Sequence, residues 1–168
     1  MKISYHAFSL VEVLVVIVLL SMAAAAFRAT GMTQMFRSWS LEHTLSEQSQ
    51  TLLRGIERAR TLAISSGQSV MLCGGRACNG AWSDALYLTY ATGGTPLWRK
   101  EFAAQTRINW QGFPQQRDYI EFLPTGLASY QNGSFYICLE QSHAQRVIIN
   151  QSGRAYLDAP NYAAKECL

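Results

Sequence analysis

Proline and charge are both scarce at the start of this 168-residue chain. No proline occurs before Pro96, and Glu12 is the only charged residue between Phe8 and Phe27. A long proline-free stretch permits long helices, because proline removes a backbone hydrogen bond and breaks a helix interior. Charged residues make up only 15% of the chain and hydrophobic residues 49%, so the composition excludes an intrinsically disordered protein.

The sequence also lacks the usual signatures of catalysis. It contains neither a Gly-Lys-Ser/Thr phosphate loop nor a Gly-x-Ser-x-Gly nucleophile elbow. His43 and Glu47 would share one helix face, but no second histidine accompanies them, so they do not form a zinc motif. The formal net charge of +3 is too small to imply a general polyanion-binding surface. We therefore predict that the protein is not an enzyme and holds neither a cofactor nor a metal ion.

Residues 8–27 form an almost purely apolar run. As a helix with a rise of ~1.5 Å per residue, this run would be about 30 Å long, which matches the hydrocarbon core of a bilayer. Residues 1–7 are short, polar and basic, as expected of a cytoplasmic end. We predict that residues 8–30 span a membrane. A cleaved secretory signal is the alternative, since the alanines at 23–26 resemble its cleavage site.

Glu12 argues against that alternative, because an acid inside an apolar membrane helix costs a few kcal/mol. Cleavage between Ala7 and Phe8 would create a new α-amino group one helical turn before Glu12. The carboxylate and the amine would then neutralise each other, within one chain or between neighbouring subunits. Cleavage at this bond would therefore explain why an apolar helix tolerates Glu12.

The helical pattern continues through residues 31–67 as an amphipathic segment. Apolar or small residues recur at spacings of three and four and make one stripe. They are Leu45, Ser49, Leu52, Ile56, Ala59 and Ala63. Gly67 follows two serines and suits the left-handed position after a helix end. One long helix and two helices separated near Gly31 are both compatible with this pattern.

From residue 68 onward, short β-type runs alternate with turn residues. The predicted strands are 69–73, 86–90, 97–102, 107–110, 119–122, 134–139, 146–150 and 155–157. The predicted turns are Gly74-Gly75, Gly93-Gly94, Pro124-Thr125-Gly126, Asn132-Gly133 and Ser152-Gly153. We predict an α+β protein in which a long N-terminal helix packs on a C-terminal antiparallel β-sheet head, residues 68–168.

All four cysteines follow the apolar run, in the part of the chain expected outside the cytoplasm. An even number there suggests two disulfides, although spacing alone allows three connectivities and free core thiols are an alternative. We favour Cys73 with Cys78 and Cys138 with Cys167. Chain entropy values these bridges at roughly 2 and roughly 3.6 kcal/mol.

The stretch Ala7-Phe8-Ser9-Leu10-Val11-Glu12 resembles the type IV prepilin motif, with Ala7 where that motif usually has glycine. Further along, several segments occur in the order typical of the FimT/FimU/GspH family of minor pilins and pseudopilins. They are Ala59-Arg60, Ala63-Ile64, Leu72-Cys73, Cys78, Trp82, residues 122–126, Gly133-Ser134-Phe135, Cys138 and Ser152-Gly153-Arg154. The chain resembles this family from Ala7 to about Leu157.

This resemblance implies a type IV pilin-like fold and a leader peptide, residues 1–7, that prepilin peptidase removes before Phe8 is N-methylated. It also implies insertion in the inner membrane with the head in the periplasm. The subunit would then join other major and minor pilins at or near the tip of a pilus at the cell surface. The resemblance further implies that Glu12 sets the axial register of assembly by meeting the methylated amine of an adjacent subunit. A GspH-like pseudopilin of a type II secretion system is the alternative.

Some members of this family bind DNA during natural transformation through a motif similar to Gly-Arg-x-Arg. The matching stretch here is Gly153-Arg154-Ala155-Tyr156, in which tyrosine replaces the second arginine. Arg146, Arg154, Tyr156 and Lys165 are the candidate DNA contacts. The alternative for these residues is an ordinary solvated turn.

Overall fold

The computed structural model describes residues 9–29, 32–115, 117–140 and 143–158. The chain divides into two compact units, Met1–Ser40 and Leu41–Leu168. Helix α1 (Leu10–Ala29) belongs to the first unit, and helix α2 (Met32–Ser66) begins there and continues into the second. The predicted leader and residues Ala7, Phe8, Gly31, Lys165 and Cys167 lie outside the described residues.

Helix α1 carries apolar side chains on all of its sides. Its large hydrophobic residues between Leu10 and Met22 are 46% to 81% exposed within the isolated chain. A helix that is apolar all round is one that other molecules bury, since water cannot solvate it favourably. Among the residues that the structure describes, no helix combines the length and the apolar character needed to cross a membrane.

The described residues contain two helices, α1 and α2, while residues 30–31 between them lie outside the described residues, so the break near Gly31 stays a prediction. Helix α2 ends at Ser66, and Gly67 takes the predicted left-handed conformation with φ +65°. The amide of Gly67 donates a hydrogen bond to the carbonyl of Ala63 at 3.1 Å. The helix end therefore has the glycine cap that the sequence indicated.

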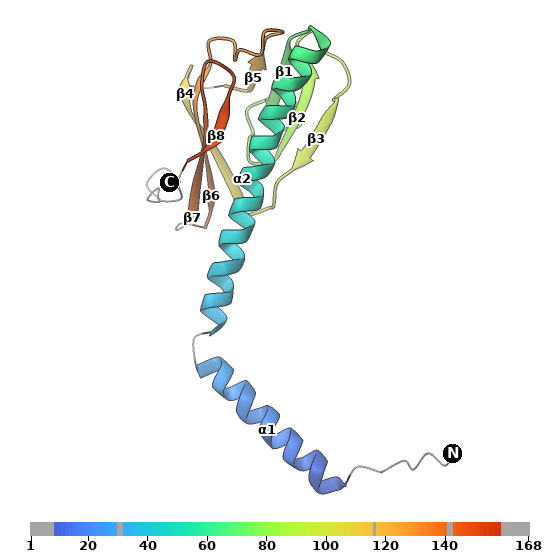
Figure 1. Cartoon of the computed structure of the whole chain (residues 1–168), viewed down its shortest axis with the longest axis vertical. Helices are drawn as coiled ribbons and strands as arrows, with labels where there is room; N and C mark the ends of the chain where they lie inside the picture. The colour runs from blue at the N-terminus through green and yellow to red at the C-terminus, as the bar shows by residue number, and fades with distance from the viewer. Residues whose placement is uncertain (1–8, 30–31, 116, 141–142, 159–168) are drawn as a thin grey trace, which may run out of the picture. The chain divides into compact units, whose positions relative to one another are not determined.

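The described residues of the second unit form eight strands in two antiparallel sheets, so the α+β prediction is confirmed (Figure 1). Sheet A has the order β3-β2-β1-β5 and sheet B the order β4-β6-β7-β8. The bounds of sheet A are β1 (Val70–Gly74), β2 (Ala85–Tyr90), β3 (Trp98–Glu101) and β5 (Tyr119–Phe122). Those of sheet B are β4 (Thr106–Phe113), β6 (Asn132–Leu139), β7 (His143–Ile149) and β8 (Ala155–Leu157).

Each predicted strand matches one of these elements, but the predicted turn at Asn132-Gly133 is wrong. These residues open strand β6, where Gly133 pairs with Gly112 on one side and Ile149 on the other. A Cβ atom on Gly133 would come within 2.8 Å of the Trp110 ring and 2.6 Å of the Gly112 Cα. Glycine stands here because a neighbouring ring and backbone approach closely, which a local turn signal cannot distinguish from a turn.

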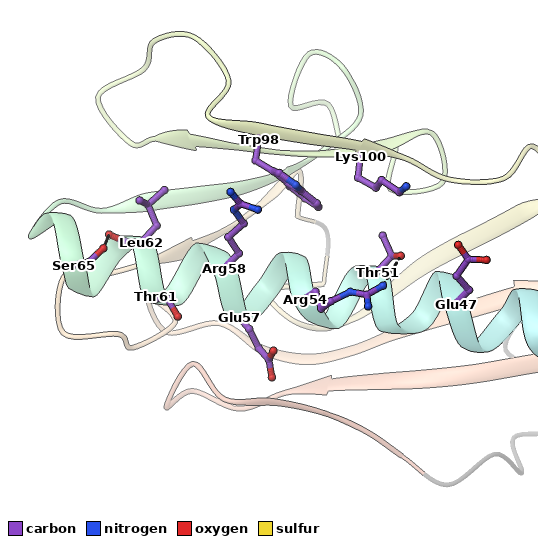
Figure 2. Close-up of a pocket in the computed structure, with 10 residues that line it drawn as sticks. All are labelled: Glu47, Thr51, Arg54, Glu57, Arg58, Thr61, Leu62, Ser65, Trp98 and Lys100. Carbon is purple, nitrogen blue, oxygen red and sulfur yellow. Dashed lines mark hydrogen bonds between the residues drawn. The ribbon is translucent and has the colours of Figure 1, made fainter.

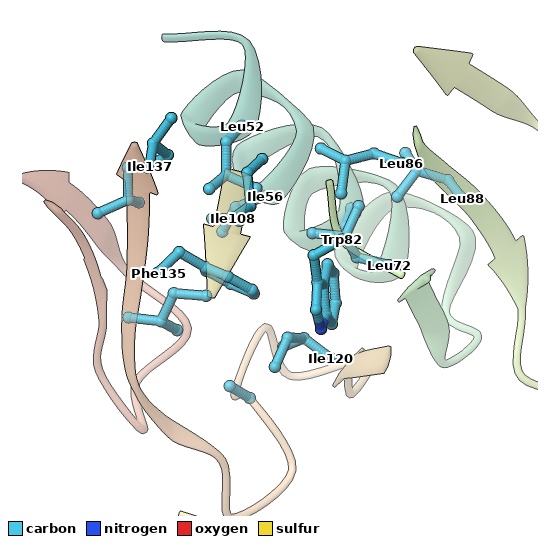
Figure 3. Packing of buried hydrophobic residues seen from close by; sticks show 14 of the residues in the cluster. Leu52, Ile56, Leu72, Trp82, Leu86, Leu88, Ile108, Ile120, Phe135 and Ile137 are labelled. Atoms are coloured by element: carbon cyan, nitrogen blue, oxygen red, sulfur yellow. The ribbon is translucent and has the colours of Figure 1, made fainter. Parts of the chain in front are cut away.

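The second half of α2 packs against both sheets and completes the core (Figure 3). The predicted stripe, from Leu45 to Ala63, is buried at every position. Leu52 and Ile56 share one cluster with residues of both sheets. Leu72, Leu86, Leu88 and Ile120 come from sheet A, and Ile108, Phe135 and Ile137 from sheet B.

Candidate functional site

Glu12 lies in the first turn of α1 and is the acidic residue predicted to set the register of assembly. Its amide donates a hydrogen bond to the Ser9 carbonyl at 3.0 Å. Val11 and Val13 beside it are 67% and 48% exposed. The structure thus places one carboxylate on an exposed apolar helix. The amine predicted to pair with it would come from Phe8, outside the described residues, so this pairing stays a prediction.

The disulfide between Cys73 and Cys78 is present, as predicted, with a Cα–Cα distance of 4.8 Å. It closes the loop that follows strand β1 and that leads to Trp82. The Trp82 indole is 4% exposed and donates its Nε1 hydrogen to the Arg117 carbonyl at 2.9 Å. Its ring centroid lies 4.7 Å from that of Phe135 in sheet B. The loop closed by this disulfide therefore places the Trp82 ring in the core, where it packs against Phe135 of sheet B.

Cys138, on strand β6, is also disulfide-bonded. Cys167, its predicted partner, lies outside the described residues, so the pairing between them stays a prediction.

Three of the four candidate DNA contacts are described, and they lie on or beside the neighbouring strands β7 and β8. The Nε of Arg146 donates to the Asp158 carboxylate at 3.1 Å, and its guanidinium lies 6.0 Å from the Tyr136 ring centre. Tyr156 pairs with Ile148, two residues from Arg146 along β7, and the Arg154 carbonyl accepts a hydrogen bond from the Asn150 amide at 2.9 Å. Lys165 lies outside the described residues, so a shared DNA-binding patch stays a prediction. Tyr156 is 46% exposed. An internal carboxylate already offsets the charge of Arg146.

A joint at the end of α2 brings together segments that are far apart in the sequence. The Nε of Arg60 donates a hydrogen bond to the Gly126 carbonyl at 3.1 Å. That carbonyl would lie only 2.1 Å from a Cβ atom on Gly153, which has φ +74°. The turns ending at Gly126 and Gly153 thus stack on each other beside the helix. Three of the family-like segments noted in the sequence meet at this joint, namely Ala59-Arg60, residues 122–126 and Ser152-Gly153-Arg154, which the sequence order alone did not reveal.

The sequence interpretation also missed a groove between α2 and strand β3 (Figure 2). It has a volume of about 630 Å³. Its helix side carries Glu47, Thr51, Arg54, Glu57, Arg58, Thr61, Leu62 and Ser65, and its strand side carries Trp98 and Lys100. These residues were read as parts of an amphipathic helix and of a short strand. Only the packing of helix on sheet places their charges side by side.

Comparison with protein families agrees with this architecture. The profile described as type II transport protein GspH matches residues 48–153. The chain belongs to the GspH family. The prokaryotic N-terminal methylation motif matches residues 4–27, which adds the second diagnostic part of a pilin. Together these matches make this GspH-family protein a minor pilin or pseudopilin, a structural subunit that assembles with other pilins and is anchored through its N-terminal motif.

Solved structures share the fold of this GspH-family chain. The type IV minor pilin FimU of Pseudomonas aeruginosa is 18% identical with a TM-score of 0.59, over 71% of this chain and 94% of FimU. The minor pseudopilin EpsH of the Vibrio cholerae type II secretion system is 14% identical with a TM-score of 0.54. That match covers 73% of this chain and 98% of EpsH. Among curated proteins, none matches the chain.

Proposed function

We propose that this protein is a minor pilin of a type IV pilus. Prepilin peptidase cuts between Ala7 and Phe8, Phe8 is N-methylated, and residues 8–30 hold the subunit in the inner membrane with its head in the periplasm. The subunit then enters a pilus at or near the tip and reaches the cell surface. The observation that carries the proposal is the methylation motif over residues 4–27, joined to an apolar helix with Glu12 as its acidic residue.

The mechanism follows from the exposed apolar surface of α1. Lipid covers this surface while the subunit waits in the membrane, and like helices cover it in the filament, so the transfer has a small net hydrophobic cost. Inside that bundle, an unpaired carboxylate would be expensive. Glu12 therefore selects the axial position at which it meets the methylated amine of an adjacent subunit.

A pseudopilin of a type II secretion system is the second candidate, and the match to the GspH profile supports it. Both filaments use the same N-terminal chemistry. The two predicted disulfides and the likeness to FimU favour the pilus. Deletion of the gene separates the candidates, because a pilus subunit is required for sheared surface filaments and a pseudopilin for release of secreted enzymes.

DNA binding remains a separate hypothesis for Arg146, Arg154, Tyr156 and Lys165. Arg154 and Tyr156 are exposed, whereas Arg146 is engaged by Asp158. A gel-shift titration tests the hypothesis, since a phosphate-binding patch must lose affinity steeply as salt rises. The hypothesis would be ruled out if the protein did not shift the DNA band, or if the shift did not weaken as salt rises.

The decisive test of the main proposal is the mass of the mature N-terminal peptide from the native host. The expected peptide begins at Phe8 and carries one added methyl group. A chain that begins at Met1, or one that begins after the alanines at 23–26, would remove the amine that Glu12 needs and would overturn the proposal.

A further inference from the structure

The groove between α2 and β3 lies where sheet A ends, because β3 is the outermost strand in the order β3-β2-β1-β5. Trp98 pairs with Leu88 and Lys100 with Leu86, so both side chains project from the core face of the sheet. Figure 2 shows the Trp98 ring directed from this strand toward the helix, with Lys100 farther along the same strand. The groove therefore lies between the edge strand β3 on one side and one face of α2 on the other.

Three cations line this groove together with Glu47 and Glu57. In the part of the chain that the structure describes, Arg54, Arg58 and Lys100 make no ion pair. Arg54 contacts only the Thr51 hydroxyl, at 3.4 Å, and the Arg58 guanidinium lies 5.9 Å from the centre of the Trp98 ring. Positive charges gathered this way repel one another, and an anionic partner would relieve that repulsion.

The outer edge of β3 offers a backbone template beside these charges. No strand of the described residues pairs with that edge, so its outward amides and carbonyls are open to another extended segment. A segment added there would direct alternate side chains to the face that bears Trp98 and Lys100. Those side chains would enter the groove, where Arg54 and Arg58 line the opposite wall.

We propose that this groove binds an extended acidic segment of a neighbouring pilin subunit, which adds to the edge of β3 and places its carboxylates against Arg54, Arg58 and Lys100. The inference rests on the proposed function and specifies one of its subunit contacts. Trp98 supplies the apolar part of the surface, because its ring lies against the helix at Gly55, with 3.4 Å to a Cβ atom built there.

Two simpler interpretations explain less of the groove. An inward-facing lysine on an edge strand discourages unwanted strand pairing, but that function needs Lys100 alone and not the arginines of α2. A nucleic acid would also meet the cations, yet Glu47 and Glu57 line the same groove and would repel a continuous phosphate chain. A peptide can carry carboxylates on alternate residues only. It can therefore place them near the cations of the groove and keep them away from its two glutamates.

The test is site-specific photocrosslinking of the full-length protein in its native host. A photoreactive benzoylphenylalanine replaces Leu97, which is 42% exposed and precedes β3 without carrying groove charge. Leu127 is 47% exposed in another loop and serves as the matched control position. The expected adduct at position 97 joins a different pilin subunit, and mass spectrometry maps it to a segment rich in Asp or Glu.

Arg54→Glu should lower the yield of this adduct about tenfold, because it places like charges face to face. Arg107→Glu, an exposed charge reversal on strand β4, should leave the yield unchanged. Neither variant should alter any adduct formed from position 127.

A third probe at Leu19 of α1 separates the two levels of the proposal. If position 19 crosslinks to other pilins but position 97 gives no adduct, joins nucleic acid or joins only a second copy of this chain, the groove inference is overturned and the pilin function stands. If neither position crosslinks to pilins, the proposed function fails and the inference with it.

Discussion

Helix α1 and the second half of α2 belong to the same class of secondary structure, but they bury their apolar residues in different ways. Leu10 and Leu19 in α1 are 81% and 60% exposed within the chain, whereas Leu52 and Ile56 in α2 are fully buried. The difference lies in the distribution of apolar residues around each helix, on all sides of α1 and in one stripe on α2.

This contrast shows that one chain contains two distinct kinds of hydrophobic surface. The stripe of α2 is covered by the protein's own sheets, so it contributes to the stability of the head. The large apolar residues of α1 are exposed within the chain, so under the proposed function lipid or other subunits cover them. Stability of the fold and assembly of the filament should therefore respond to different substitutions.

The largest difference between an effect on assembly and an effect on membrane insertion is expected for Glu12→Ala. The variant should insert in the membrane at normal levels, because it removes a costly charge from an apolar helix. Its incorporation into filaments should fall by about a hundredfold or more, since loss of one partner leaves the buried amine uncompensated at about 3–5 kcal/mol. Immunoblots of membrane and sheared-filament fractions measure both effects. Ser21→Ala, which removes a polar group from the same helix, is the control, and normal incorporation of Glu12→Ala would contradict the mechanism.

Leu52→Ala should show the reverse behaviour. Removal of a fully buried leucine should lower the free energy of unfolding of the head by about 2–5 kcal/mol, because it leaves a cavity between helix and sheets. Membrane insertion should be unaffected. Urea unfolding of the full chain in detergent provides the measurement. Ile64→Ala, at a position 49% exposed on the same helix, should cost much less, and equal costs would indicate that the stripe does not form the core.

Removal of the Cys73–Cys78 disulfide measures how much one short loop contributes to the stability of the head. The double variant Cys73→Ser, Cys78→Ser should lose about 2 kcal/mol of unfolding free energy, the entropy expected from so short a loop. The same urea titration measures it, with the parent protein under reducing conditions for comparison. A loss well above this range would mean that the bridge also holds Trp82 in place.

The smallest effects are expected at Gly55, inside α2, and at Gly67, which follows its last residue, and they should have opposite signs. Gly67→Ala forces a side chain into a left-handed conformation with no nearby atoms, and should destabilise the head by about 1 kcal/mol. Gly55→Ala meets Leu86 and Trp98 at ordinary contact distance within the helix, and should stabilise it by about 0.5–1 kcal/mol. Thermal unfolding of the two variants side by side measures both signs. The same sign for both would show that backbone conformation is not the governing factor.

Much of this architecture could be predicted because the signals are local. The stripe of α2, the glycine cap at Gly67 and the alternating runs of the strands each follow from residues within one or two turns of one another. The Cys73–Cys78 bridge could also be predicted, because its two cysteines are only five residues apart in the sequence. Asn132-Gly133 shows where this approach fails, because the same dipeptide serves a turn or a close approach to Trp110, and only the neighbouring strand distinguishes them.

The sequence by itself determined the apolar helix with its single acid, the amphipathic helix and the order of the strands, since periodicity and composition act along the chain. Only the tertiary structure decided that Arg60 meets Gly126 and Gly153, that Arg146 is offset by Asp158, and that Arg54, Arg58 and Lys100 line one groove. These contacts join residues from different elements, and their energies depend on distances in space that spacing along the chain does not fix.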